Sequence, residues 1–319
     1  MIHLVFTGGT ISMQHDPAAG GNVPAHGGEQ LVALAPGLDR ISPFRIENWA
    51  RVPAAHLGPD RLWALRERIR ELQNGAGDGA PPQGIVITHG TDTLEETAYL
   101  LARTLDPAVP VALTGAMRTS SDPDWDGPRN LRDAAAVAAS PASAGRGAMV
   151  VFAGAVFSGR EAVKTDTMRL DAFAAPHGQP LGRVADGRVT YTAPVPPTAP
   201  LAARGLGARV ALVPMVIGDR GEMLDLARPT HDGVVIVAFG SGNLPPGALP
   251  AIRRWLDEGK PAVLASRCPT GVVTPAYAFE GGGAGLVKLG VVPAGPRTPS
   301  QARMELAITL SAGVPYAAA

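Results

Sequence analysis

Short, mainly apolar runs separated by helical segments constrain the fold of this 319-residue chain more than any other feature. In the first half they recur at residues 2–6, 85–87, 109–113 and 149–152, and each is followed at once by Gly, Thr or Ala. Continuous hydrophobicity is typical of strands that are covered on both faces, as in a parallel sheet with helices on either side. The pattern predicts a doubly wound, mostly parallel α/β sheet.

The segments between the runs have helical periodicity. Leu62, Leu65, Ile69 and Leu72 follow one another at steps of 3, 4 and 3, and Pro59 precedes them at a position typical of a first helical turn. This spacing predicts an amphipathic helix from residue 59.

A proline-rich stretch divides the chain. Four prolines between residues 194 and 200 exclude a continuous helix and favour an extended linker. Beyond it the alternation resumes, with apolar runs at 210–213, 234–238 and 262–265 around a helical segment at 246–258. We therefore expect an N-terminal domain at 1–190, a linker at 191–208 and a smaller C-terminal α/β domain at 209–319.

Composition narrows the function. Acidic and basic residues number 28 each, which removes the basic excess typical of proteins that bind nucleic acids or anionic membranes, so a small-molecule ligand is expected. Cys268 is the single cysteine, so neither a disulfide framework nor a thiolate metal cluster is expected.

The opening apolar run is too short for a signal peptide, which favours the cytoplasm. Charged residues make up only 18%, which favours a buried subunit interface and hence an oligomer.

Ligands of such sheets bind beyond the carboxyl ends of the strands, and three small, hydroxyl-rich turns follow the apolar runs there. They are T-G-G-T-I-S at 7–12, T-H-G-T-D-T at 88–93 and T-G-A-M-R at 114–118. The first is neither G-x-G-x-x-G nor a Walker A loop, so a nucleotide site is not predicted. Thr10 is either a cap for the next segment or a nucleophile, if a neighbouring base removes its proton.

The second turn and a rare lysine add candidates. Thr93 and Glu96 have capping-box spacing, which predicts a helix start and places Asp92 at the helix N-terminus. Asp92 there is either a surface cap or a carboxylate that binds a cationic group such as a substrate ammonium. Lys164 is one of only three lysines and can help deprotonate a threonine, either as a positive neighbour or as a neutral base.

Taken together, these motifs give the chain a family resemblance. The turns at 7–11, 89–93 and 114–118 resemble signatures of bacterial-type L-asparaginases, and D-G-P-R-N-L at 126–131, S-G-N-L at 241–244 and T-P-S-Q-A-R at 298–303 follow in the family's order. The resemblance implies two α/β domains in a homodimer or homotetramer. It also implies hydrolysis of a side-chain amide to the acid and ammonia, without metal or organic cofactor.

The resemblance also implies roles for individual residues. Thr10 matches the nucleophile that forms an acyl-enzyme, and Thr91 and Lys164 match groups that activate or orient the nucleophile and water. Asp92 matches the residue that holds the substrate α-ammonium, and Asn243 matches a residue that reaches the site of the neighbouring subunit.

The sequence departs from the family's pattern in three places. The loop at 13–31 has no tyrosine, although the family has one there as a proton relay. Ala54 and Ala55 stand where the family has the side-chain donors for the substrate carboxylate, so only their backbone can contribute. The glutamate supplied across the interface has no clear counterpart, because Ala278 falls at its spacing and Glu280 is displaced.

We interpret the chain as an amidohydrolase with L-asparagine as substrate. An unpaired substrate carboxylate would lose about 1–3 kcal/mol of binding unless backbone N–H groups or His56 replace the missing donors, so weak asparagine affinity or a shifted substrate is expected. D-asparagine, glutamine or another amide remain alternatives, as does a catalytically silent ligand-binding homologue. The subunit that deamidates misacylated tRNA is disfavoured, because the chain has no basic excess.

Overall fold

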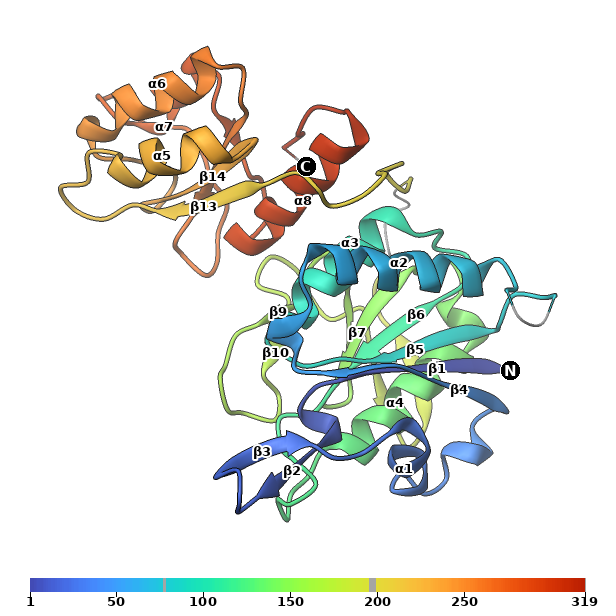
Figure 1. Ribbon diagram of the computed structural model, residues 1–319. Coiled ribbons are helices and arrows are strands. Elements are labelled where there is room, and N and C mark those ends of the chain that lie inside the picture. The colour runs from blue at the N-terminus through green and yellow to red at the C-terminus, as the bar shows by residue number, and fades with distance from the viewer. Residues whose placement is uncertain (77–78, 195–198, 319) are drawn as a thin grey trace. The chain divides into compact units, whose positions relative to one another are not determined.

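The computed structural model describes residues 1–76, 79–194 and 199–318 and forms two compact units, Met1–Pro200 and Leu201–Ala319 (Figure 1). Each unit has its own sheet and its own core. Of the prolines that predict the linker, Pro196 and Pro197 lie outside the described residues.

The first unit is built on an eight-stranded sheet. From β7 to β4 all neighbouring strands are parallel, and β8, β11 and β12 extend the sheet with antiparallel pairings. The mostly parallel sheet predicted from the apolar runs is confirmed. In spatial order the strands are β12 (Arg188–Tyr191), β11 (Gly182–Ala185), β8 (Ala155–Ser158), β7 (Ala148–Phe152), β6 (Val111–Thr114), β5 (Gly84–Thr88), β1 (Ile2–Gly8) and β4 (Phe44–Val52).

Helices cover both faces of this sheet, as Figure 1 shows. Successive side chains of β5 explain the continuous apolar run, because Ile85 and Ile87 belong to the core on one face while Val86 belongs to the core on the other. The helices are α2 (Pro59–Gln73) and α3 (Leu94–Thr104) on one face and α1 (Gly28–Ala33) and α4 (Gly127–Ala139) on the other.

The edge strand β4 was not predicted. Its residues are partly buried or exposed, because at the edge of the sheet it pairs only with β1. A search for continuous apolar runs therefore passes over it, although it is the longest strand of this sheet. Its carboxyl end leads to the segment that contains Ala54 and Ala55.

The segment after Thr10 forms a hairpin of β2 (Met13–Asp16) and β3 (Gly21–Pro24). The Ser120 N–H donates to the Met13 carbonyl at 3.1 Å, and the Ser121 hydroxyl accepts from the His15 N–H at 3.0 Å. These bonds attach the first strand of the hairpin to the loop that follows β6. A second small antiparallel pair, β9 (Val163–Lys164) with β10 (Phe173–Ala174), presents Lys164.

The second unit has a four-stranded, fully parallel sheet in the order β13 (Val210–Pro214), β14 (Gly233–Ala238), β15 (Ala262–Ser266) and β16 (Val292–Pro293). Its helices are α5 (Glu222–Ala227), α6 (Leu249–Asp257), α7 (Gly283–Leu289) and α8 (Pro299–Ala312). The smaller α/β fold expected for this half of the chain is confirmed. The predicted helix at 246–258 begins as a short 3-10 turn, Pro246–Ala248, before α6.

A capping box starts α8. The Thr298 hydroxyl accepts from the Gln301 N–H at 3.4 Å, and the Gln301 side chain accepts from the Thr298 N–H at 3.1 Å. The T-P-S-Q sequence thus satisfies two backbone donors at a helix start. Short 3-10 turns complete the described structure, at Thr10–Ser12, Leu38–Arg40, Ala54–His56, Pro141–Ser143 and Arg228–Thr230. In the part of the chain that the structure describes, no helix combines the length and apolarity needed to cross a membrane.

Candidate active site

The turn after β1 brings Thr10 to the carboxyl end of the sheet. Gly8 and Gly9 have φ angles of 111° and 85°, a region that disfavours side chains, and a Cβ on Gly9 would lie 2.4 Å from the Cα of Gly90. The two turns therefore touch backbone to backbone. The Ser12 hydroxyl donates to the Gly9 carbonyl at 2.8 Å, which closes the turn around the half-buried Thr10.

The turn after β5 is held by His89. This side chain is fully buried, and burial lowers its pKa to about 4, so the imidazole is neutral. Its Nδ1 donates to the Gly90 carbonyl at 2.8 Å, and its Nε2 accepts from the Thr97 hydroxyl at 2.9 Å. His89 therefore supports the turn as a structural residue.

Thr91, Asp92 and Lys164 meet beside this turn. The Lys164 Nζ donates to the Thr91 Oγ1 at 2.9 Å and to the Asp92 Oδ1 at 3.0 Å. Thr91 is buried, at 4% exposure, whereas the Asp92 side chain is 73% exposed. Because an ammonium group only donates hydrogen bonds, the Thr91 hydroxyl keeps its own proton for a partner other than Lys164. Asp92 offers an open carboxylate at the mouth of the sheet.

Glu95 fixes the backbone of Lys164, and sequence reasoning missed it. Its Oε2 accepts from the Lys164 N–H at 2.7 Å, and burial raises the pKa of this carboxyl group. The contact joins residues 69 positions apart, so no local motif signals it. Glu95 lies in the first turn of α3 and ties that helix to β9.

The predicted capping box at Thr93 is wrong in its side-chain bond, although α3 begins where it predicts. The Thr93 hydroxyl donates to the carbonyl of Ala54 at 3.3 Å instead of capping α3. The bond ties the start of α3 to the 3-10 turn Ala54–His56. The hydroxyl therefore donates to a tertiary carbonyl instead of accepting from the local backbone N–H that the spacing suggested.

The third turn is held by the D-G-P-R-N-L run. The Asp126 carboxylate accepts from the N–H groups of Met117, at 3.1 and 3.0 Å, and Arg118, at 3.0 Å. The Asn130 side chain donates to the Gly115 carbonyl at 3.1 Å. Asp126 and Asn130 thus hold the backbone of this turn. The D-G-P-R-N-L motif did not predict this role.

Ala54 and Ala55, which the family resemblance assigns to the substrate carboxylate, lie next to the second turn. A Cβ on Gly90 would lie 2.7 Å from the Ala54 Cβ, so these two backbones pack closely. Ala54 is buried, while Ala55 and His56 are exposed. The first N–H groups of a helical turn have no partner within it, so Ala54 and Ala55 can offer backbone donors only.

Asn243 belongs to the second unit. It follows β14, its N–H donates to the Phe239 carbonyl at 3.0 Å, and its side-chain oxygen accepts from the Gly283 N–H at 3.4 Å. Ala278 and Glu280 are both exposed in the segment before α7. Within the described residues, no group of three or more His, Cys, Asp or Glu side chains is arranged to hold a metal ion.

Comparison with known proteins assigns the family. Residues 1–196 match the family model for the asparaginase N-terminal domain, and residues 209–318 match that for the glutaminase/asparaginase C-terminal domain. A parallel α/β sheet with threonine, aspartate and lysine at its carboxyl edge agrees with that match. The chain belongs to the asparaginase family and is an amidohydrolase of that family.

Individual relatives agree over most of the chain. A probable L-asparaginase of Deinococcus radiodurans is 38% identical, over 97% of this chain and 92% of that protein. A glutaminase-asparaginase of Pseudomonas aeruginosa is 30% identical, over 84% and 75%. The solved structure of a probable cytoplasmic L-asparaginase from Campylobacter jejuni superposes with a TM-score of 0.82 at 27% identity, over 97% of this chain and 94% of that one.

Proposed function

We propose that this enzyme hydrolyses L-asparagine to L-aspartate and ammonia through a threonine nucleophile and an acyl-enzyme. The observation that supports this most directly is the placement of the Lys164 ammonium on both Thr91 and Asp92. The cluster lies beside Gly90, which touches the turn of Thr10. The printed names of the Deinococcus radiodurans and Campylobacter jejuni relatives point to the same substrate.

The first half-reaction is acylation. The Thr10 Oγ attacks the side-chain amide carbon of the substrate, the C–N bond breaks, and the hydroxyl proton leaves with the nitrogen as ammonia. The Thr91 hydroxyl relays that proton, because Lys164 donates to its oxygen and leaves its hydrogen free for transfer. In the second half-reaction, water attacks the ester and restores Thr10.

Backbone donors support the charge that develops on the substrate oxygen. Among the described residues, the N–H groups of Thr10 and Thr91 donate to no protein acceptor, which leaves them available for an oxyanion. Asp92 binds the α-ammonium of the substrate through the carboxylate oxygen that does not accept from Lys164. The carboxylate of the substrate receives only backbone donors near Ala54 and Ala55, so we expect weak asparagine affinity.

The decisive experiment measures ammonia release from L-asparagine, D-asparagine and L-glutamine by the wild type and by Thr10→Ala and Thr91→Ala. We expect L-asparagine to be preferred and both variants to lose at least a hundredfold in kcat. A wild type inactive on every amide, or variants that keep its rate, would refute the proposal.

A nucleophile trap tests the acyl-enzyme directly. Hydroxylamine added during turnover should divert part of the product to the β-hydroxamate of aspartate. The ratio of hydroxamate to acid should be the same for L-asparagine and for a β-anilide of aspartate, because both pass through one ester. A ratio that changes with the leaving group would contradict a shared intermediate.

We also propose a homo-oligomer, a dimer or a tetramer, in which Asn243 reaches the site of a neighbouring subunit. Support comes from large apolar side chains exposed on the second unit, which sedimentation velocity can test against a monomer. They are Leu212, Val216, Ile217, Met223 and Leu226. A cytoplasmic location, proposed from the printed name of the Campylobacter jejuni structure, is tested by cell fractionation.

A further inference from the structure

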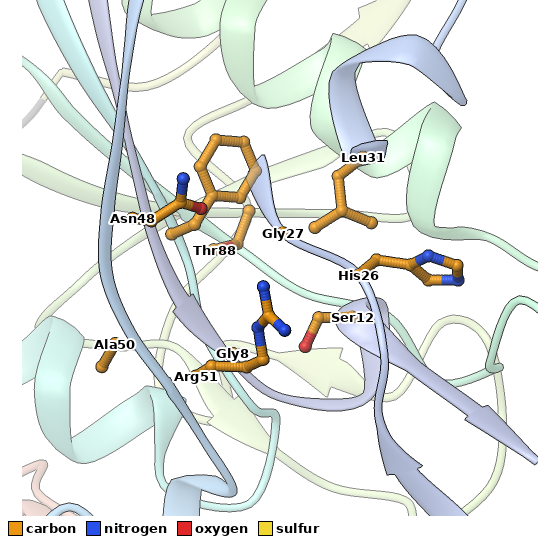
Figure 2. A pocket seen from close by; sticks show the side chains of 10 residues that line it. Gly8, Ser12, His26, Gly27, Leu31, Asn48, Ala50, Arg51 and Thr88 are labelled. Atoms are coloured by element: carbon orange, nitrogen blue, oxygen red, sulfur yellow. The ribbon is translucent and has the colours of Figure 1, made fainter. Parts of the chain in front are cut away.

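A cavity of about 250 Å³ opens at the carboxyl ends of β1, β4 and β5 (Figure 2). It is separate from the proposed catalytic cluster, because neither Thr10, Thr91, Asp92 nor Lys164 lines it. No carboxylate lines it either, so it offers no partner for an ammonium group. Its lining includes Phe6, Ser12, Leu31, Asn48, Arg51 and Thr88.

One part of the cavity is apolar. Phe6 and Leu31 are almost fully buried, and the chain passes tightly over Phe6 because residue 28 is glycine. A Cβ on Gly28 would lie 2.5 Å from the Phe6 ring. This wall suits a short hydrocarbon chain, which gains by leaving water.

Thr88 also lines the cavity, but its hydroxyl oxygen is closed off from the cavity space. The residue is 1% exposed, and its Oγ1 has no hydrogen-bond partner among the described residues. Its carbonyl accepts from the Thr7 hydroxyl at 2.8 Å, which fixes the residue in place. Thr88 therefore closes one side of the cavity and offers the ligand no accessible hydrogen-bond donor.

Arg51 supplies a cation over the same space. Figure 2 shows its side chain extending between Ser12 and Gly27, and a Cβ on Gly27 would lie 3.0 Å from the Arg51 Nη2. In the described part of the chain the Arg51 guanidinium makes no hydrogen bond and no ion pair. The nearby Glu29 carboxylate instead accepts from the Asn48 side chain at 3.1 and 2.9 Å.

The pKa of Glu29 agrees with Asn48, rather than Arg51, as the main partner of this carboxylate. It is lowered first by the hydrogen bond from Asn48, with the charge of Arg51 as a smaller cause. The planar Arg51 guanidinium thus keeps its N–H donors for another acceptor. Two parallel N–H donors match the two oxygens of a carboxylate, so a carboxylate is the acceptor that fits best.

We propose that this cavity is a second ligand site that binds a small monocarboxylate with a short apolar chain. The carboxylate pairs with Arg51, while the hydrocarbon lies against Phe6 and Leu31. The ligand would also contact Ser12, whose hydroxyl closes the turn that holds the proposed nucleophile. The site is therefore placed to influence that turn, although its existence does not depend on the proposed reaction.

Binding of n-butanoate tests the site. In chloride buffer, ligand-observed NMR should show saturable binding with a Kd on the order of millimolar, as expected for so few heavy atoms. Butanamide and n-butylammonium, which have a similar chain without the negative charge, should not bind measurably. Absence of saturable butanoate binding would overturn the proposal.

Variants locate the binding. Arg51→Gln and Arg51→Met should each weaken it about tenfold to a hundredfold, the range expected for hydrogen bonds to a charged group. Arg51 is exposed, so its substitutions do not disturb the core, and a loss of binding in these variants reports on the site itself. Butanoate binding that is unchanged in both Arg51 variants would refute the assignment.

A control separates this site from the proposed catalytic cluster. Asp92→Asn should retain butanoate binding, because Asp92 does not line the cavity. Loss of binding in Asp92→Asn together with retention in Arg51→Gln would place butanoate in the catalytic cluster and overturn the proposal. The same measurements in Thr10→Ala need no turnover, so their outcome is independent of whether the proposed reaction occurs.

Discussion

Removing the charge of Lys164 separates its proposed role in catalysis from its role in the fold. Lys164→Met keeps most of the side-chain length but deletes the ammonium that lies 2.9 Å from the Thr91 Oγ1 and 3.0 Å from the Asp92 Oδ1. We expect kcat to fall by about a hundredfold to ten thousandfold, the range of a positioned acid–base group. We expect the free energy of unfolding to change by less than about 1 kcal/mol.

The predicted loss of kcat is much larger than the predicted loss of stability because the two partners of Lys164, Thr91 and Asp92, differ in burial. The Asp92 side chain is 73% exposed, and a pair of charges 3.0 Å apart in water gains only about 1.4 kcal/mol before side-chain ordering offsets it. Thr91 is 4% exposed, and at an effective dielectric constant of about 20 a charge developing 2.9 Å from the ammonium is stabilised by up to about 6 kcal/mol. The predicted loss of kcat, about 2.7–5.5 kcal/mol, falls within that limit.

Ammonia release at varied substrate concentration gives kcat and KM, and urea unfolding gives the stability. Lys288→Met is the matched control, because it removes the same charge from an exposed position in the second unit. A Lys164→Met variant that keeps kcat within threefold of the wild type would refute the assignment. So would an equal loss in Lys288→Met, since that would point to net charge rather than position.

Four further predictions follow from the described contacts. Glu95→Ala should lower kcat about tenfold while Glu95→Gln keeps most of it, because glutamine retains an acceptor for the same backbone N–H; steady-state kinetics of both variants checks this. Gly9→Ala should lower the free energy of unfolding by at least about 1–3 kcal/mol, measured in urea, because φ is 85° and the new Cβ would lie 2.4 Å from a backbone atom. The double variant Ala54→Ser/Ala55→Gln should lower KM for L-asparagine about tenfold to a hundredfold by supplying side-chain donors; an unchanged KM would show that the backbone already suffices. Burial lowers the pKa of His89 from 6.5 in the unfolded chain to about 4 in the folded protein. The unfolded state therefore binds the proton more tightly, and up to about 3 kcal/mol of stability that is present above pH 6.5 is lost as the pH falls from 6.5 to 4. Urea unfolding of the wild type should show a steeper loss over that window than His89→Gln.

The sequence predicted the strands that are buried on both faces, because such strands consist of continuous apolar residues. It failed at β4 and at the hairpin of β2 and β3, where the burial pattern is mixed and the side chains are partly exposed. The antiparallel extension by β8, β11 and β12 was also missed, since four-residue strands leave little signal of their own. Periodicity thus finds the centre of a sheet more readily than its edges.

Long-range contacts limited what could be predicted about the site. Lys164 was noticed because lysine is rare in this chain, yet only the fold brings it to Thr91, 73 positions away. Glu95 was missed for the same reason, since its partner is a backbone N–H on a distant two-residue strand. Thr93 shows the opposite error, because its local spacing suggested a cap and its hydroxyl donates to Ala54 instead.

The packing of the turns also bears on what the proposed site can recognise. Gly9 touches Gly90, and Gly90 in turn lies against Ala54, so this side of the site consists of backbone and methyl groups with no room for a side chain on Gly9 or Gly90. Asp92, by contrast, presents an open carboxylate. The proposed substrate is therefore recognised strongly at its ammonium and weakly at its carboxylate, because a charged partner faces the former and only neutral backbone donors face the latter. Selectivity among amides then rests more on the amino group and on the distance from it to the amide than on the acid group.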